Sequence, residues 1–173
     1  TRAMGFPDPN DPDGTSLFWK IIGRNKRCVV LDLKDPADVE RVLRLAEGAH
    51  VLVENLRPGG LEKLGLGPDE LLARNPNLVI TRVTVFGQDG PYANRPGFAT
   101  IAEAMSGFAG LNGEADGAPM LPPIALTDEL TAMSAAFATM TALHSGVGQV
   151  VDVNLLDTLL QTMGPLPAAY AAT

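Results

Sequence analysis

Short apolar runs alternate with helix-forming segments along most of this chain, and this alternation constrains the fold more than any other feature of the sequence. Four runs are expected to form strands, at about 28–33, 50–54, 78–85 and 149–153. The segments between these runs are long enough for the crossover connections, usually helical, that parallel strands need. The first two runs and the helix between them should form a right-handed, parallel βαβ unit. The sequence therefore predicts an α/β fold built on a parallel sheet.

The ends of several helices can also be predicted. Asp35 followed by Pro36 is typical of an N-cap and a first helical residue, and that helix is expected to end near Gly48. Its buried stripe should consist of Val39, Val42, Leu43 and Ala46. Three further helices are expected: one from Pro68 to about Asn75, a small-residue helix at 98–108, and one at 154–163 capped by Asn154.

Composition narrows the class of protein. With 173 residues, 46% of them hydrophobic, the chain can bury a sizeable core. No apolar segment approaches the roughly 20 residues that span a bilayer, and the N-terminal residues lack the features of a signal peptide. We therefore expect a cytoplasmic protein without membrane contacts. The single cysteine, Cys28, excludes an internal disulfide, and its apolar run predicts a packed core thiol.

The charges are distributed unevenly along the chain. A net charge of −7 argues against a nucleic-acid partner or an anionic membrane surface. All 13 Lys and Arg residues and 13 of the acids lie at or before Arg95. The other 7 acids follow Arg95, in a part of the sequence that contains no Lys or Arg. A small anionic ligand is therefore expected to dock on the first half. Alternatively, bases such as Arg41, Arg44 and Arg74 simply belong to solvated helix faces.

Two loops are candidates for function. Residues 55–60 (NLRPGG) follow the expected strand 50–54, and ligands of open α/β sheets gather outside the C-terminal ends of strands. This loop is expected to contact phosphate or pantetheine, although a plain Pro-Gly turn is the alternative. The glycine- and proline-rich loop from Phe86 to Gly97 is long enough to indicate a functional role. By contrast, residues 1–16 are typical of an extended, irregular arm.

Asp128 is the main candidate for chemistry. The run before Thr127-Asp128-Glu129 should deliver these residues to the start of a helix, whose apolar side chains Leu130, Met133, Phe137 and Met140 share one face. The positive end of a helix dipole stabilises a carboxylate, so Asp128 should stay ionised at neutral pH, with Glu129 as a second partner of the dipole. Position alone also allows the simpler interpretation that Thr127 or Asp128 only caps this helix.

An ordered series of motifs resembles the family III CoA-transferases, which also include the α-methylacyl-CoA racemases. The motifs are RNKR at 24–27, LDLK at 31–34, VENLRPG at 53–59, LGL at 64–66, NP at 75–76, FGQDGPY at 86–92, AMSG at 104–107, TD at 127–128 and GQVVDV at 148–153. The resemblance implies a Rossmann-like, parallel-sheet CoA-binding α/β domain. It also implies an interlocked homodimer in the complete protein.

The resemblance assigns site residues position by position. Leu31 and Lys34 match positions against the adenine and phosphate end of coenzyme A, and Asn55, Leu56 and Arg57 lie in the loop that borders it. Lys63 and Leu64 match a basic and apolar pair that holds the cofactor. Lys63 stands where the family often has Arg, which keeps the charge but loses the bidentate fork. No metal is expected.

By the same resemblance, Asp128 is the catalytic nucleophile. Its carboxylate would attack an acyl-CoA thioester, and CoA would then pass through an aspartyl thioester to a carboxylic acid acceptor. Covalent catalysis of this kind divides one difficult transfer into easier steps. The substrates implied are therefore an acyl-CoA and a carboxylic acid, although their identities stay open.

Alternatives to this function differ in what they require. A racemase of the family carries a His-Asp pair where this chain has Phe98 and Ala99, neither of which can exchange a proton, so racemase activity is disfavoured. A non-catalytic CoA-binding or dimerisation fragment is the other alternative. In domain terms, residues 17–163 are expected to be the central part of the CoA-binding domain. Residues 164–173 should begin a linker toward a second domain.

Overall fold

A computed structural model describes residues 2–172, and its contacts divide the chain into two units between Asp32 and Leu33. The boundary after residue 16 expected from the sequence stays a prediction. Each unit is described by itself below. Within the described residues, no helix is long and apolar enough to cross a membrane.

The first unit contains turns and the short helix α1 (Leu17–Ile22). The Ser16 hydroxyl caps α1 by accepting a hydrogen bond of 3.1 Å from the amide of Trp19. An isolated antiparallel bridge joins Pro7 to Ser16, and Lys20 Nζ lies 2.6 Å from Asp8 Oδ2. The irregular arm predicted for residues 1–16 therefore folds back onto the start of α1.

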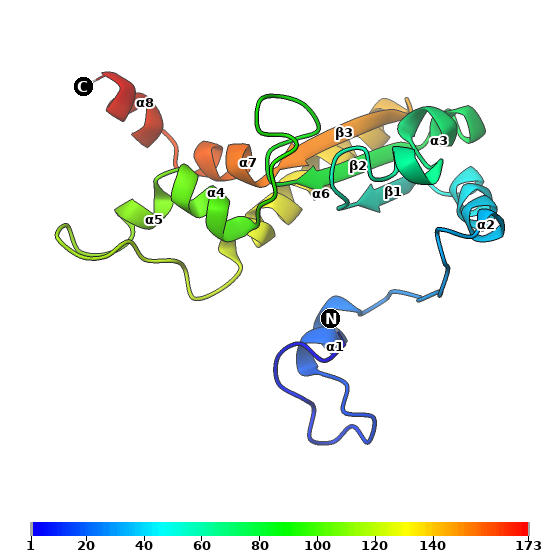
Figure 1. The fold of residues 1–173 in the computed structure, drawn as a ribbon, viewed down its shortest axis with the longest axis horizontal. Helices are drawn as coiled ribbons and strands as arrows, with labels where there is room; N and C mark the ends of the chain where they lie inside the picture. Colours follow the sequence, from blue (N-terminus) through cyan, green and yellow to red (C-terminus); the bar gives the residue numbers. More distant parts are fainter. Residues whose placement is uncertain (1, 173) are drawn as a thin grey trace. The chain divides into compact units, whose positions relative to one another are not determined.

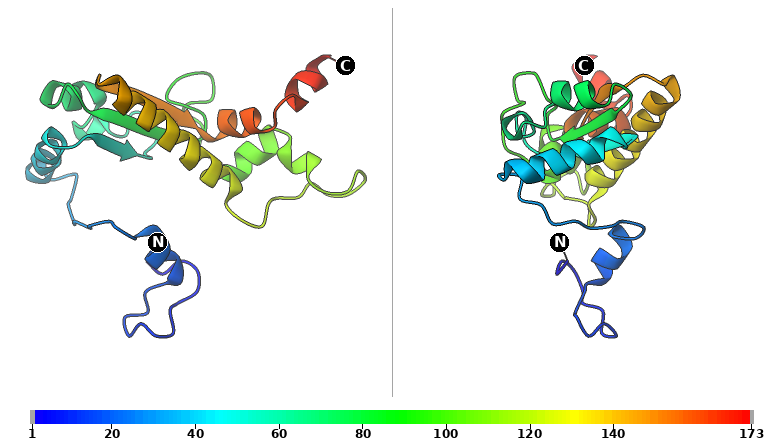
Figure 2. Two further views of the ribbon diagram at one scale, coloured as in Figure 1. Left: turned by 180° about the vertical axis from the view of Figure 1, so that it is seen from behind. Right: turned by 90° about the vertical axis from the view of Figure 1, so that its right-hand side faces the viewer.

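The second unit contains the sheet and the remaining helices, shown in Figures 1 and 2. In chain order they are α2 (Pro36–Glu47), β1 (Val51–Glu54), the 3-10 turn η1 (Glu62–Leu64), α3 (Pro68–Arg74), β2 (Val79–Thr84), α4 (Ala99–Met105), α5 (Phe108–Leu111), α6 (Leu126–Ser145), β3 (Gln149–Asn154), α7 (Leu155–Thr162) and α8 (Leu166–Ala172).

The three strands form one parallel sheet in the order β1-β2-β3. Val51 pairs with Val79, and Val79 pairs in turn with Gln149. A crossover that includes α3 joins β1 to β2, and a longer one that includes α6 joins β2 to β3. The predicted α/β fold with a parallel sheet is thus confirmed, as are three of the four predicted strands.

The prediction of a strand at 28–33, the first of the four runs along the chain, is wrong. Residues 28–32 have no regular secondary structure and pair with no described strand, and Val29 and Val30 are 67% and 96% exposed. Cys28 is also exposed, so the prediction of a packed core thiol is wrong as well. An apolar, β-branched run favours extended backbone, but a strand needs a partner whose hydrogen-bonding groups are free. The βαβ unit predicted from the runs at 28–33 and 50–54 is therefore wrong too, and the first βαβ unit that the structure describes is β1-α3-β2.

Helices cover both faces of the sheet. On one face, Ile80 of β2 packs with Ala46 of α2 and Leu71 of α3 in an apolar core. On the other face, Thr81 of β2 and Thr139 of α6 share a buried hydrogen bond of 2.6 Å. This alternation follows from the two-residue period of a strand, which sends successive side chains to opposite faces.

Helix α6 turns an unusual face toward the sheet. Its buried residues are small or hydroxyl-bearing: Thr127, Thr131, Ala135, Thr139 and Ala142. The apolar side chains Met133, Phe137 and Met140 share one face, as the sequence indicated, but are 70%, 78% and 63% exposed. Hydroxyls can be buried here because they find acceptors; Thr131 Oγ1, for example, donates to the carbonyl of Thr127 at 2.7 Å.

Most predicted helix ends are confirmed. Asp35 accepts from the amide of Ala37 at 2.9 Å, and Asn154 accepts from the amide of Asp157 at 2.8 Å. The helix predicted at 98–108 is instead two helices, α4 and α5, separated by Gly107 with a φ of 85°. This left-handed conformation suits glycine and interrupts the helical hydrogen bonds.

Candidate active site

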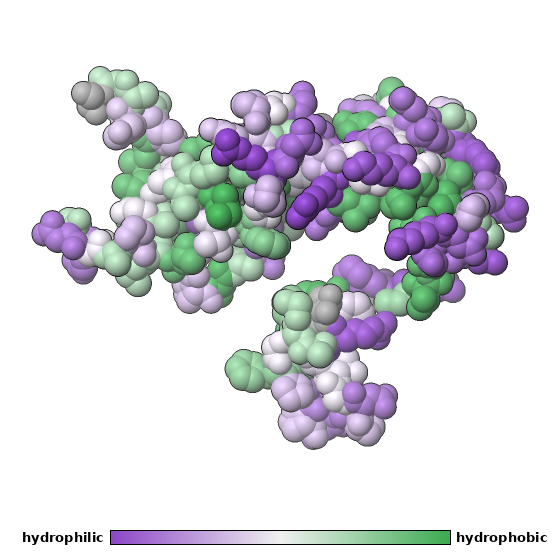
Figure 3. Space-filling model, in the orientation of Figure 1, coloured by the Kyte–Doolittle hydropathy of each residue, from purple (hydrophilic) through white to green (hydrophobic). Residues whose placement is uncertain are grey.

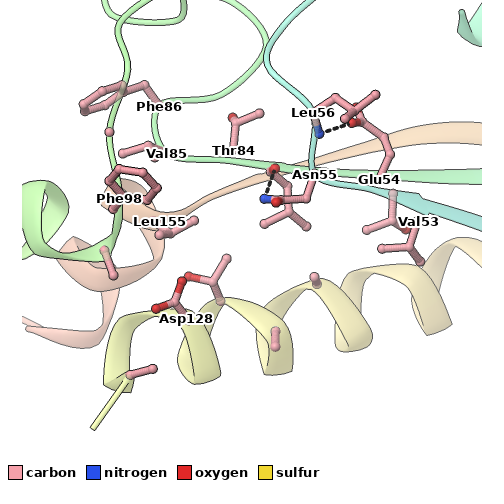
Figure 4. A pocket seen from close by; sticks show the side chains of 18 of the residues that line it. Val53, Glu54, Asn55, Leu56, Thr84, Val85, Phe86, Phe98, Asp128 and Leu155 are labelled. Atoms are coloured by element: carbon pink, nitrogen blue, oxygen red, sulfur yellow. Dashed lines mark hydrogen bonds between the residues drawn. The ribbon is translucent and has the colours of Figure 1, made fainter. Parts of the chain in front are cut away.

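A large cavity of about 1170 Å³ lies between α6 and the C-terminal ends of β1 and β2. The loop after β1 contributes Asn55 to Pro58, and the loop after β2 contributes Val85, Phe86 and residues 95–98. Figure 4 shows Asp128 projecting from α6 toward these loops. Parallel strands end at one edge of their sheet, which brings the two predicted functional loops, 55–60 and 86–97, to the same cavity.

Asp128 lies in the first turn of α6, together with Glu129. The residue at the N-cap position is Ala125, and no side chain caps the helix. A loop therefore delivers Asp128 to the helix N-terminus as predicted, whereas the interpretation of Thr127 or Asp128 as a cap is wrong. Asp128 is left free to face the cavity.

The surroundings of Asp128 oppose its ionisation. Burial raises the pKa of its carboxyl group above the ordinary value, and the negative charges of Glu103 and then Glu129 raise it further. A hydrogen bond from its own backbone amide acts in the opposite direction. The sequence correctly placed Asp128 at the positive end of a helix but did not reveal the opposing effect of burial and acids.

Glu103 was not identified from the sequence, yet it lies in the wall of the same cavity. It is only 4% exposed, in helix α4, and its Oε1 accepts a hydrogen bond of 2.8 Å from the hydroxyl of Thr127. Thr127 is fully buried and directly precedes Asp128. The only signal in the sequence was an acid inside a helix of small residues, beyond the last basic residue of the chain.

The predicted loop residues Asn55, Leu56 and Arg57 all line the large cavity. The amide group of Asn55 donates to the carbonyl of Val83 at 3.1 Å, and the backbone amide of Leu56 donates to Glu54 Oε2 at 2.6 Å. Both contacts are drawn in Figure 4. They attach the loop to the ends of β1 and β2, so its position is set by the sheet.

Arg82 of β2 extends this attachment through ion pairs. Its Nε donates to Glu54 Oε1 at 2.7 Å, and its Nη1 donates to Glu62 Oε1 at 2.8 Å. The side chains of Arg82 and Glu54 are each 5% exposed. The hydrogen bond from Arg82 lowers the pKa of Glu62. A single guanidinium thereby joins the end of β1 to η1, which carries Lys63 and Leu64.

Lys34, Lys63 and Leu64 line a second, small cavity of about 400 Å³. The rest of its lining consists of Leu33, Pro36, Val39, Glu40 and Leu43. Three residues assigned to the cofactor from separate motifs thus lie around one hollow, with cationic groups beside aliphatic ones. Leu31, assigned to the same ligand, lies in the first unit and is half-buried there; its role stays a prediction.

Arg95 is a second residue of the large cavity that the sequence did not single out. Its guanidinium carbon lies 4.4 Å from the centre of the Tyr92 ring. Neither Arg95 nor Arg57 forms an ion pair with any residue that the structure describes. Two guanidinium groups of the cavity wall are therefore available to an anionic ligand.

The structure is thus an α/β protein with an acid at a helix start, two loops at the ends of parallel strands and a separate lysine-lined hollow. The model of the CoA-transferase family III matches residues 1–173, and the chain belongs to this family. The family resemblance drawn from the sequence motifs is thereby confirmed.

Curated relatives and solved structures agree with this assignment. The chain is 40% identical over 164 residues to the succinyl-CoA–D-citramalate CoA-transferase of Chloroflexus aurantiacus, covering 92% of this chain and 41% of that protein. It is also 40% identical over 164 residues to the succinate–glutarate CoA-transferase of Agrobacterium fabrum, covering 91% of this chain and 41% of that protein.

Among solved structures, a CAIB/BAIF family protein from Brucella suis superposes with a TM-score of 0.90 at 31% identity. The match covers all of this chain and 47% of that protein. The chain therefore spans less than half the length of these relatives.

Proposed function

We propose that the protein transfers coenzyme A from an acyl-CoA donor to a carboxylic acid, with Asp128 as the covalent nucleophile. The observation that carries this proposal is the position of Asp128, which has no capping role, lies at a helix start and faces a large cavity bordered by both predicted loops. Membership of the CoA-transferase family III supports the same reaction.

The proposed reaction proceeds through two anhydrides and one thioester of Asp128. The Asp128 carboxylate attacks the thioester carbonyl, the C–S bond breaks, and an acyl-aspartyl anhydride and CoA thiolate result. The thiolate attacks the aspartyl carbonyl, releasing the donor acid and leaving an aspartyl-CoA thioester. The acceptor carboxylate then attacks this thioester, the C–S bond breaks, and a second anhydride, between acceptor and Asp128, and CoA thiolate result. The thiolate attacks the acceptor carbonyl of this anhydride, and the bond from that carbonyl to the Asp128 oxygen breaks. Acceptor-CoA leaves, and the Asp128 carboxylate is restored.

Coenzyme A would occupy both cavities. In this proposal its phosphates pair with Lys34 and Lys63, whose ammonium groups are compact point charges, while Leu64 packs against the nucleotide. Asn55, Leu56 and Arg57 then border the part of the ligand that leads to the thioester. The Arg82 ion pairs support this placement of coenzyme A. They connect the end of β1, which precedes the loop 55–57, to η1, which carries Lys63 and Leu64.

The acceptor is proposed to be a dicarboxylic acid. One carboxylate of such an acid must attack the aspartyl thioester while the other needs a cation. Arg57 and Arg95 are guanidinium groups of the large cavity without an acidic partner among the described residues. The two curated relatives described above are named for citramalate and glutarate, which are dicarboxylates.

Racemase activity is not favoured, because it needs groups that remove and return a proton. Phe98 and Ala99 line the cavity where such a pair would be expected, and Phe98 is 81% exposed. We further propose that the complete protein is an interlocked homodimer, in which the exposed apolar face of α6 formed by Met133, Phe137 and Met140 becomes covered.

Trapping of the intermediate tests the proposed function. The full-length protein is incubated with succinyl-CoA and hydroxylamine, which should convert activated Asp128 to its hydroxamate, detected in the peptide by mass spectrometry. The same incubation without acyl-CoA is the control. An unmodified Asp128 peptide under conditions of measured turnover would exclude the covalent mechanism. Absence of turnover with all acyl-CoA donors would favour a non-catalytic CoA-binding protein.

A further inference from the structure

We propose that Glu103 is a positioning residue that acts on Asp128 through the Thr127 hydroxyl and through its own negative charge, making the Asp128 carboxylate a stronger nucleophile. This inference rests on the proposed function.

The geometry ties Glu103 to the start of α6. Glu103 Oε1 accepts the Thr127 hydroxyl at 2.8 Å across the contact between α4 and α6. Thr127 in turn accepts, through its carbonyl, the hydroxyl of Thr131 at 2.7 Å. All three side chains are buried, so this chain of hydrogen bonds fixes the helical turn from which Asp128 projects.

The burial of Glu103 is hard to explain by stability alone. A buried carboxylate is normally paired with a cation, because removing a charge from water is costly. Within residues 2–172, Glu103 forms no ion pair, and its side chain accepts from a neutral hydroxyl. Glutamine would accept the same hydrogen bond without the charge. A purely structural role would therefore favour Gln at position 103.

The charge has a physical consequence at Asp128. The charged and titratable groups around Asp128 are Glu103 from α4, Glu129 from α6, and Glu54, Arg57 and Arg95 from the cavity wall. Glu54 is neutralised by Arg82. After burial itself, Glu103 is the largest cause that raises the pKa of Asp128. A more basic carboxylate is a better nucleophile, and repulsion between the two anions disappears once Asp128 is acylated to a neutral group.

Three variants of the full-length protein test the inference. Glu103→Gln keeps the hydrogen-bond acceptor but removes the charge, Glu103→Asp keeps the charge, and Glu129→Gln is the matched control. Glu129 contributes a smaller effect on the same carboxyl group and is exposed. The measurements are the rate of acylation of Asp128 by succinyl-CoA, the pH dependence of that rate, and thermal unfolding.

For Glu103→Gln we expect acylation at neutral pH to slow about three- to tenfold, because removing the charge lowers the pKa of Asp128 and a less basic carboxylate is a weaker nucleophile. The acid limb of its pH profile should move to lower pH, while the melting temperature stays equal or rises. Glu129→Gln should change the rate by less than about twofold, and Glu103→Asp should retain more activity than Glu103→Gln.

Each other outcome overturns the inference. If acylation by Glu103→Gln matches wild type, or its acid limb does not move, the charge of Glu103 does not act on Asp128. If the rate falls together with the melting temperature, Glu103 has a structural role. A wild-type protein that is never acylated at Asp128 would overturn the proposed function and this inference together, whereas normal wild-type acylation with an unaffected Glu103→Gln variant overturns this inference alone.

Discussion

The two cavities of the second unit differ in size, charge and the kind of residue that surrounds them. The small cavity combines the cations Lys34 and Lys63 with aliphatic side chains and with Glu40, which is paired with Arg74. The large cavity is lined by the acids Glu103 and Asp128, by Glu54, which is paired with Arg82, and by Arg57 and Arg95. We therefore expect the small cavity to contribute affinity and the large cavity to contribute chemistry.

This difference has its origin in the uneven charge of the sequence. Every Lys and Arg lies at or before Arg95, and both cavities draw their cations from that part of the chain. Figure 3 shows hydrophilic surface over α2 and α3, whereas the region of α4 and α5 is more hydrophobic. An acid that follows the last Lys or Arg of the sequence and lines a cavity, such as Glu103 or Asp128, is therefore a stronger functional candidate than an acid among many bases.

The largest expected effect is at Asp128. Asp128→Asn should lower kcat by at least about 10³-fold, because the amide is not a nucleophile, while the Kd for CoA changes less than about twofold. Stability should change by less than about 1 kcal/mol, since Asp128 caps no helix. Steady-state kinetics, CoA titration and thermal unfolding measure these effects. If the variant is active and has not deamidated to Asp, the assignment of the chemistry to Asp128 in the large cavity is wrong.

Arg82→Met should produce the next largest effect, on the structure that links the two cavities. Loss of Arg82 leaves Glu54 buried without its cation, which is expected to cost about 3–5 kcal/mol. Urea unfolding measures this cost. Arg74→Met is the matched control, because Arg74 forms two ion pairs but is 40% exposed, so its loss should destabilise the fold far less. Equal destabilisation by both variants would contradict the importance of burial.

Lys34→Ala and Lys63→Ala should weaken CoA binding about tenfold at low salt without a matching loss of kcat. The effect should shrink as salt screens the phosphate charge. Arg44→Ala provides a control on the surface of α2, where Arg44 contacts Glu40. Calorimetric titration at several salt concentrations measures the affinities. If CoA binds both Lys variants and wild type equally, the small cavity does not hold the nucleotide.

The smallest expected effect concerns pH and stability. The pKa of Asp128 is raised in the folded protein, so the fold binds this proton more tightly than the unfolded chain does. Its contribution to stability is therefore fully present below the unfolded pKa and is lost as pH rises through the folded pKa. We expect less than about 1 kcal/mol, because part of the side chain is exposed.

Unfolding of wild type and Asp128→Asn by urea across acidic and neutral pH measures this contribution. Wild type should lose stability relative to Asp128→Asn as pH rises. The acylation rate should show the complementary trend, falling on acidification at a higher pH than an ordinary aspartate would require. A difference in stability of the opposite sign would contradict the raised pKa.

Local sequence signals determined much of the fold and part of the candidate site. Asp35-Pro36 and Asn154 mark helix starts because their side chains bond the nearest free amides, and these contacts depend on only a few neighbouring residues. The family motifs, read from the sequence alone, assigned Lys34, Lys63 and Leu64 to one ligand, and all three line one cavity.

Local sequence did not reveal which apolar runs pair, which face of a helix is buried or which acids meet. The run 28–33 has a strand-like sequence but no described partner, and α6 buries its threonines rather than Met133, Phe137 and Met140. Glu103 and Thr127 are 24 residues apart and meet through a single hydrogen bond. Strand pairing, the buried face of a helix and contacts between distant residues all depend on which other segments lie nearby in the fold. A local sequence pattern does not contain that information.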